Sequence, residues 1–268
     1  MTGFSALVLA GSRGEADPVA RAAGVSHKGL ATVGGETLLA RVIGALSVAG
    51  AGRIAVSTSD PEIEAATLAI TSGGPSAFVE TIPASGSPSQ SVAAAFGQLG
   101  TPLLVTTVDH ALLQSEWIAQ FMADTPADAD IAALLAPEAV VRAAAPDTQR
   151  TWLKLRDGRY SGCNLFYLAS PRAIQAVELW RTVEAHRKQP WKIAAILGVD
   201  MLAQYLAGRL TLDEAVKRLG DKAGVRAAAV RSAYGLAAVD VDKPADLDLV
   251  RRIAEAPAPG LPATPSGG

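Results

Sequence analysis

Short apolar runs alternate with segments of helical periodicity along the N-terminal half of the chain, and this alternation constrains the fold more than any other feature. Four runs have the length and composition of buried strands, at 4–10, 53–58, 77–82 and 102–108. Apolar residues between these runs recur at the spacing of helices. Strands that alternate with helices predict a mostly parallel sheet covered on both faces. We therefore expect a Rossmann-like three-layer α/β/α fold with a mostly parallel mixed sheet.

The pattern changes after residue 151. An Asp157-Gly158 turn between two β-like segments indicates a β-hairpin-like excursion. A further strand is expected at 225–230 and another at 237–241, before a last helix.

Helical segments occupy the region between the hairpin and the last strands. Ser170-Pro171 begins the first of them, Pro190 a second, and Thr211 to Glu214 have the spacing of a capping box that begins a third. We expect one domain over 1–256 with a helical insertion at about 170–220, followed by a disordered tail at 257–268.

Composition excludes several classes of protein and site. Among 268 residues Cys163 is the single cysteine and three residues are histidines, which excludes a disulfide framework and a multi-cysteine zinc site. The formal net charge of −2 gives no overall attraction to nucleic acid, so nucleic acid is not an expected partner. No segment reaches the roughly 20 apolar residues of a membrane span, and the N-terminus lacks the basic start of a signal peptide. We expect a cytoplasmic protein without a transmembrane segment, and leave peripheral membrane contact and the oligomeric state open.

The first predicted strand ends in a turn that contains two glycines, Leu9-Ala10-Gly11-Ser12-Arg13-Gly14. Glycines allow a tight turn whose backbone N–H groups approach phosphate oxygens closely. The turn is neither a P-loop nor a dinucleotide-binding fingerprint. Taken alone, it is equally well explained as an ordinary loop without a ligand.

A lysine and a Gly-Gly pair follow this turn, in the segment His27-Lys28-Gly29-Leu30-Ala31-Thr32-Val33-Gly34-Gly35-Glu36-Thr37-Leu38-Leu39. With the turn, this segment resembles the MobA-like NTP transferases, a family of guanylyl-, cytidylyl- and sugar-phosphate nucleotidyltransferases. The resemblance implies a GT-A-like nucleotidyltransferase fold in which Arg13 and Lys28 bind the phosphates of an NTP. It also places the nucleotide against the turn, at Leu9, Ala10, Gly11, Ser12 and Gly14. Ser12 stands where the family usually has a second glycine, and the family's common Arg-Met-Gly is missing from 15–26.

Asp109 directly follows the predicted strand at 102–108. A carboxylate at the carboxyl end of a parallel strand faces the ligand crevice of such a sheet. Members of the family carry a magnesium-binding aspartate at this strand end, so the resemblance implies Mg²⁺ as cofactor and Asp109 as a metal ligand and catalytic residue. One or two carboxylates suffice, because Mg²⁺ takes substrate phosphates as further ligands. The alternative is an aspartate that only caps the next turn.

The resemblance extends to a closing motif at 239–247, Val-Asp-Val-Asp-Lys-Pro-Ala-Asp-Leu. Alternation along an extended strand puts Asp240 and Asp242 on the same side, so either could be the second metal ligand. We favour Asp240, because Asp242 also fits as the N-cap before Pro244. Asp246 is expected to be structural.

Two further segments are candidates for selecting the base and the acceptor. In the family, positions similar to the segment 85–92 contact the nucleobase, which implies this role for Ser85 and Ser91. The alternative is that Ser89 caps the next helix. Ser161-Gly162-Cys163-Asn164 resembles a segment that lines the acceptor side in relatives, which implies an acceptor contact for Asn164. Cys163 is expected to be a small buried residue rather than a nucleophile.

The densest basic and aromatic cluster of the chain lies at 180–192. Lys188 and Lys192 are the candidates there for binding the phosphate of an acceptor. The alternative is a solvated helix face with no ligand.

These features together predict transfer of an NMP from an NTP, CTP or GTP, to a phosphorylated small molecule or lipid precursor, with release of pyrophosphate. An acceptor phosphate is already anionic, so the reaction needs positioning and charge stabilisation rather than a strong base. Three alternatives remain. They are a molybdenum cofactor guanylyltransferase-type enzyme, a GT-A glycosyltransferase that uses Asp240-Val241-Asp242 as an Asp-x-Asp motif, and a non-catalytic nucleotide-binding protein.

Overall fold

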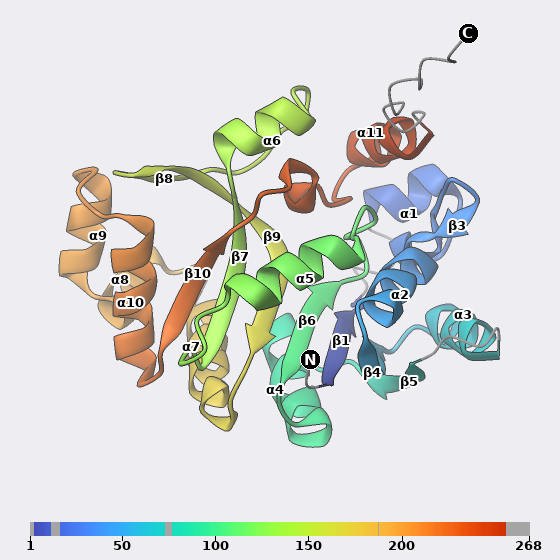
Figure 1. The fold of residues 1–268 in the computed structure, drawn as a ribbon, viewed down its shortest axis with the longest axis horizontal. Coiled ribbons are helices and arrows are strands. Elements are labelled where there is room, and N and C mark those ends of the chain that lie inside the picture. Colours follow the sequence, from blue (N-terminus) through green and yellow to red (C-terminus); the bar gives the residue numbers. More distant parts are fainter. Residues whose placement is uncertain (1–2, 12–16, 73–76, 187, 256–268) are drawn as a thin grey trace, which may run out of the picture.

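The computed structural model describes residues 3–11, 17–72, 77–186 and 188–255, which are arranged around one large sheet (Figure 1). The order across the sheet is β10 (Ala227–Arg231), β7 (Ile131–Pro137), β9 (Gly158–Leu168), β6 (Leu103–Thr107), β1 (Phe4–Leu9), β4 (Ala51–Thr58) and β5 (Phe78–Pro83). A short strand, β8 (Leu153–Leu155), pairs with β9, and β2 (Thr32–Val33) pairs with β3 (Glu36–Thr37) in a separate antiparallel pair.

The sheet is mixed but mostly parallel, as the sequence predicted. β1 runs parallel to both β4 and β6, β4 runs parallel to β5, and β10 runs parallel to β7. β9 is antiparallel to both of its neighbours, β6 and β7. The predicted hairpin is also confirmed, because β8 and β9 flank the Asp157-Gly158 turn.

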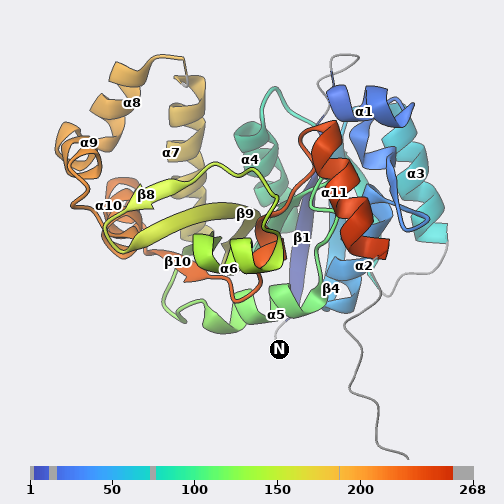
Figure 2. The same ribbon diagram turned by 90° about the horizontal axis from the view of Figure 1, so that it is seen from above.

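Helices cover both faces of the sheet and complete three layers (Figure 2). Side chains alternate along β1, so that Ala6 and Val8 join one apolar cluster and Leu7 joins another. The first cluster includes residues of α2 (Leu38–Val48), α3 (Pro61–Ser72), α5 (Ser115–Asp124), α6 (Glu138–Ala144) and α11 (Pro244–Glu255). The second includes residues of α4 (Pro88–Leu99) and α7 (Ile174–Ala185). The predicted Rossmann-like α/β/α architecture is thus confirmed.

Capping residues begin several of these helices as the sequence indicated. The Asp60 carboxylate accepts hydrogen bonds from the backbone N–H groups of Glu62 and Ile63, at the start of α3. Thr211 and Glu214 form the predicted capping box at the start of α10 (Leu212–Ala223). At the start of α4 the cap is Ser87 rather than Ser89.

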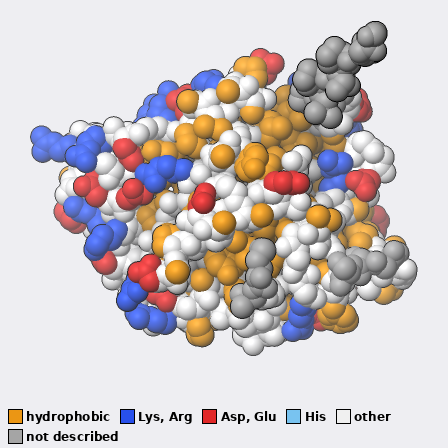
Figure 3. All heavy atoms as spheres, viewed as in Figure 1, with side chains coloured by type: hydrophobic (Ala, Val, Ile, Leu, Met, Phe, Trp, Pro, Cys, Tyr) orange, Lys and Arg blue, Asp and Glu red, His pale blue; other side chains and the backbone are white. Residues whose placement is uncertain are grey.

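The helical block expected at about 170–220 is present, with one more helix than predicted. It begins with a 3-10 turn, η3 (Pro171–Ala173), and α7. The predicted second helix is divided at Gly198 into α8 (Pro190–Leu197) and α9 (Val199–Leu206), because Gly198 has a φ of 108°, which helices exclude. Figure 3 shows acidic and basic side chains interspersed at the end of the molecule that carries α9 and α10, where Arg218 pairs with Asp200. That this block is an insertion in a single domain stays a prediction.

The prediction of a strand at 237–241 is wrong. The chain forms a 3-10 turn there, η4 (Gly235–Ala238), and continues without pairing to a strand. Gly235 explains the difference, since its backbone approaches α6 so closely that a Cβ would lie 2.2 Å from the carbonyl oxygen of Val140. Packing against α6 therefore replaces strand pairing.

Short elements near the N-terminus were not predicted. They are α1 (Pro18–Ala23), the 3-10 turn η2 (Lys28–Leu30), β2 and β3. Among the described residues, no helix is long and apolar enough to span a bilayer. The tail predicted at 257–268 lies outside the described residues.

Candidate active site

Two segments that were predicted to bind ligand meet at the carboxyl edge of the central strands. Leu9, at the end of β1, pairs in register with Thr107 at the end of β6. The chain after β1, described as far as Gly11, and Asp109 after β6 therefore leave the sheet side by side, at the edge where open α/β sheets bind ligands. Leu9, Ala10 and Gly11 are described, whereas Ser12, Arg13 and Gly14 lie outside the described residues.

Lys28 reaches the same edge from η2. His27 caps this turn, because its Nδ1 accepts a hydrogen bond of 2.9 Å from the Gly29 N–H. Gly29 packs so closely beneath the edge that a Cβ would lie 2.8 Å from Cγ2 of Val108. A larger residue at 29 would force η2 or the side chains of Val108 and Ile63 to shift.

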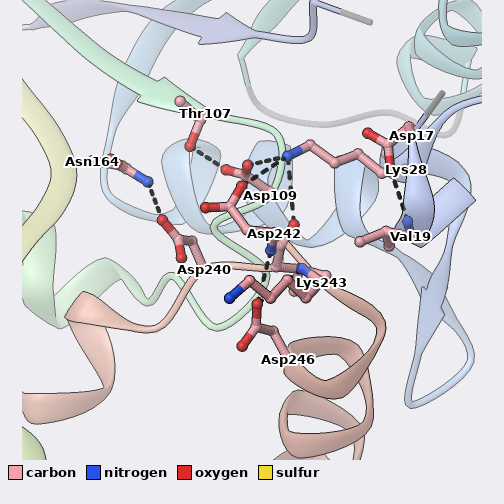
Figure 4. Close-up of polar contacts among 12 residues, drawn as sticks. Asp17, Val19, Lys28, Thr107, Asp109, Asn164, Asp240, Asp242, Lys243 and Asp246 are labelled. Carbon is pink, nitrogen blue, oxygen red and sulfur yellow. Dashed lines mark hydrogen bonds and ion pairs between the residues drawn. The ribbon is translucent and has the colours of Figure 1, made fainter. Parts of the chain in front are cut away.

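The Lys28 ammonium contacts two carboxylates (Figure 4). Its Nζ donates a hydrogen bond to Oδ2 of Asp109 and lies 3.6 Å from Oδ1 of Asp242. It also lies 3.4 Å from the carbonyl oxygen of Val241, and the Val241 N–H donates to the carbonyl oxygen of Asp109. These contacts join η2, the end of β6 and the segment after η4 into one cluster. We call Asp109 and Asp242 the carboxylate cradle.

The cradle stabilises the charged form of Lys28. Burial lowers the pKa of Lys28, but the combined attraction of Asp109, Asp242 and Asp17 more than offsets burial, so the pKa is raised. The Lys28 side chain is 13% exposed and that of Asp109 is 10% exposed, whereas that of Asp242 is 52% exposed. The cradle is thus closed on the Asp109 side and open on the Asp242 side.

The cradle fits a magnesium ion that arrives with phosphates. Lys28 already occupies it as a cation, which shows that the two carboxylates converge on one positive charge. Within the described residues, no group of three or more His, Cys, Asp or Glu side chains is placed to hold a metal alone. Two carboxylates and substrate oxygens are the donor set that Mg²⁺ commonly takes.

Asp240 has different partners from Asp242. Its Oδ1 lies 2.6 Å from Nη1 of Arg150, and its Oδ2 accepts a hydrogen bond of 2.6 Å from Nδ2 of Asn164. Burial raises the pKa of Asp240, and the attraction of Arg150 offsets this only in part. Both oxygens of Asp240 therefore face protein groups, while Asp242 shares a cation with Asp109. Asp246 is structural, as expected, since it accepts hydrogen bonds from the backbone N–H groups of Asp242 and Lys243.

Asn164 lies at an irregularity of β9. The register between β7 and β9 shifts between Ala133 and Leu135, opposite Asn164. Asn164 has a φ of 48°, which is rare outside glycine. Bulges of this kind re-aim a side chain beside a site, and this one turns Asn164 toward Asp240.

Replacing Asn164 separates the strain of this backbone from the hydrogen bond to Asp240. Asn164→Gly loses only the hydrogen bond, whereas Asn164→Ala also forces alanine into the left-handed region. We expect Asn164→Gly to be more stable than Asn164→Ala by about 1 kcal/mol. Urea denaturation of both variants measures this difference, and equal stabilities would mean that the backbone relaxes at this position.

Two serine hydroxyls of the predicted base-binding loop bond to other protein groups. Oγ of Ser91 accepts a hydrogen bond of 2.9 Å from the Ser85 N–H, and the Ser89 hydroxyl donates to the carboxylate of Glu184 on α7. A cavity of about 680 Å³ lies between this loop and the end of α7, lined by Gly86, Ser87, Gln90, Arg181, His186 and Lys188 among others. The loop predicted for the base and the lysine predicted for the acceptor thus share one cavity. Lys192 is exposed and is not among the described residues that line it.

Two side chains near the edge are unsuited to catalysis. Cys163 is buried, as expected, and burial raises the pKa of its thiol to about 12, which disfavours the nucleophilic thiolate. Burial lowers the pKa of His110 to about 4, and its ring packs against Trp117, so His110 is a neutral core residue.

Arg150 was not predicted as a site residue. It lies between α6 and β8, 90 residues before Asp240 in the sequence, and nothing in its local sequence indicates a site. Its side chain is 11% exposed, which is unusual for arginine.

Comparisons with known proteins agree with the fold. The solved structures that resemble this one include a hypothetical transferase from Thermus thermophilus, which is 31% identical with a TM-score of 0.78 and covers 92% of this chain and 100% of its own. A 4-diphosphocytidyl-2C-methyl-D-erythritol synthase from Anaerococcus prevotii is similar in fold, at 11% identity and a TM-score of 0.58, over 93% of this chain and 97% of its own. A CMP:2-keto-3-deoxy-manno-octonic acid synthetase complexed with CTP has 16% identity and a TM-score of 0.56, over 94% of this chain and 98% of its own.

No protein of curated function matches the chain. A family does match: residues 6–159, more than half of the chain, match the MobA-like NTP transferase domain. The chain therefore belongs to the MobA-like NTP transferases and is a nucleotidyltransferase.

Proposed function

We propose that the protein transfers an NMP from an NTP to a phosphorylated acceptor and releases pyrophosphate. The observation that carries this proposal is the Lys28 ammonium in contact with Asp109 and Asp242, at the edge of the sheet where β1 and β6 end. A cation and two carboxylates at this edge suit the polyphosphate of an NTP. CTP or GTP remains our expected donor, and the acceptor a phosphorylated small molecule or lipid precursor.

In the proposed reaction, an oxygen of the acceptor phosphate attacks the α-phosphorus of the NTP. The bond from the α-phosphorus to its bridging oxygen breaks on the opposite side, and pyrophosphate leaves with the electron pair. Lys28, and Arg13 from the segment outside the described residues, would neutralise the charge of the leaving pyrophosphate. Asp109 and Asp242 would hold Mg²⁺, which supplies further positive charge to the phosphates.

We propose Asp242 rather than Asp240 as the second metal ligand, which reverses the preference drawn from the sequence. Asp242 shares the Lys28 cation with Asp109, whereas Asp240 is paired with Arg150. The same difference weighs against the glycosyltransferase alternative, because the two aspartates of Asp240-Val241-Asp242 do not face one common cation.

The proposed function is tested by measuring pyrophosphate release with each of the four NTPs and a panel of phosphorylated acceptors. The panel contains sugar phosphates, phosphorylated alcohols and a molybdopterin-type acceptor. Release that requires both an NTP and an acceptor supports the proposal and identifies both. Binding of an NTP without release in any combination would support the non-catalytic alternative instead.

Lys188 stays a proposed acceptor contact, and Lys192 provides its comparison. Lys188 lines the cavity beside the predicted base loop. We expect Lys188→Ala to raise the KM for the acceptor about two- to fivefold, as for the loss of one exposed ion pair. We expect a smaller change for Lys192→Ala. Steady-state kinetics at saturating NTP measure both, and an unchanged KM in both variants would remove the two lysines from the site.

A further inference from the structure

Arg150, Asp240 and Asn164 form a second polar cluster beside the carboxylate cradle. Arg150 and Asn164 contact the two different oxygens of Asp240, each at 2.6 Å. The three residues come from the segment before β8, the bulge in β9 and the segment after η4. An arginine, a carboxylate and a strained asparagine that converge from three segments are a built arrangement rather than a surface ion pair.

This second cluster directly adjoins the cradle. Val241, next to Asp240, is hydrogen-bonded through its N–H to Asp109 and lies against Lys28 through its carbonyl oxygen. In Figure 4 Asn164 and Lys28 lie on opposite sides of the aspartates. The donor phosphates are assigned to the Lys28 side, so the Arg150 side is where a second anion would approach.

The proposed reaction requires such an anion site. Two phosphorylated molecules must come together, and their negative charges repel unless a cation separates them. A guanidinium has five N–H donors in one plane and binds phosphate oxygens in pairs, so one carboxylate does not use all of its donors. Asn164 offers an amide group at the same place.

We propose that Arg150 and Asn164 bind the phosphate of the acceptor, a phosphomonoester, and that Asp240 positions both side chains. This inference rests on the proposed function, because it assigns the second substrate of the same site. Asp240 also opposes the incoming phosphate by its charge, so it limits the affinity that Arg150 provides. Lys188 would then contact another part of the acceptor.

Inorganic phosphate is a suitable probe of this subsite. The donor site is first filled with an NTP analogue that carries a methylene group between the α- and β-phosphorus, so that no pyrophosphate leaves. Titration calorimetry then measures the Kd of phosphate for the wild type and for variants. Arg142→Met is the matched control, because Arg142 is an exposed arginine of α6 that pairs with Glu138.

The variants are chosen so that charge and folding are separated. Arg150→Met alone leaves Asp240 buried without its cation and endangers folding. The double variant Arg150→Met/Asp240→Asn removes both charges, and it should weaken phosphate binding at least about tenfold. Asp240→Asn alone also leaves one buried charge unpaired, so its folding is checked first by circular dichroism. In the folded variant the cation remains and the opposing charge is gone, so phosphate binding should tighten about threefold or more. A purely structural role of Arg150 would not produce this increase.

The proposal is overturned if the double variant binds phosphate as the wild type does, or if Asp240→Asn does not bind it more tightly. Failure of the wild type to bind the NTP analogue would contradict the proposed function instead. In that case the same titrations without the analogue still decide the role of Arg150.

Discussion

Lys28→Met is expected to lower the rate of pyrophosphate release by about 10²- to 10³-fold, the usual cost of removing one preorganised group that stabilises developing charge. Lys28 is 13% exposed and its charge is held by Asp109 and Asp242, so no surface cation replaces it in the variant. Stopped assays of pyrophosphate at saturating NTP and acceptor measure the change. Lys217→Met is the matched control. Lys217 pairs with Asp221 on α10, and its loss should change the rate by less than about twofold.

The same variant should bind a metal more tightly than the wild type when no nucleotide is present. Lys28 occupies the cradle as a cation, so it competes with any metal ion for Asp109 and Asp242. Its removal leaves two carboxylates without a cation, which favours a divalent ion. Electron paramagnetic resonance of Mn²⁺ measures the affinity. Weaker Mn²⁺ binding in Lys28→Met would contradict the assignment of these two carboxylates, and an unchanged pyrophosphate rate would remove Lys28 from catalysis.

The parts of the site that were predictable are those that local sequence encodes. The sequence shows a glycine-bearing turn after one strand and an aspartate after another. Both can be placed at the same edge of the sheet, because parallel strands bring their carboxyl ends to one edge. This argument placed the turn and Asp109 at one edge, whereas Lys28 was implied by the resemblance to the MobA-like NTP transferases. The structure places Lys28 and Asp109 in contact. The fold class was predictable for the same reason, since the alternation of strands and helices is a local pattern.

Partner choice within the site was not predictable in the same way. The alternation argument treated Asp240 and Asp242 as equivalent, but the first faces Arg150 and the second faces Lys28. The two aspartates differ because of Arg150, in the segment before β8, which comes near Asp240 only when the chain folds. The predicted strand at 237–241 was wrong for a related reason. Val239 and Val241 are buried as in a strand, but the contact of Gly235 with α6 excludes a pairing partner.

Gly235 therefore offers the second large effect, on stability. In Gly235→Ala the new Cβ would lie 2.2 Å from the carbonyl oxygen of Val140 and 2.8 Å from Cα of Val141. These are backbone atoms, which cannot rotate away, so α6 and η4 must separate. We expect a loss of about 2–3 kcal/mol, near the upper end for overpacked sites, and a melting temperature lower by roughly 5–10 °C. Scanning calorimetry measures the shift.

Gly44→Ala makes the comparison that isolates this contact. Gly44 is exposed inside α2, and nothing lies within 4 Å of the position of its Cβ. Alanine there should stabilise the protein by about 0.5–1 kcal/mol through helix propensity alone. Because η4 leads into Asp240, Gly235→Ala should also displace Asp240 from Arg150 and Asn164. This should reduce the activity of the folded variant. A Gly235→Ala protein as stable and as active as the wild type would mean that η4 does not fix the position of Asp240.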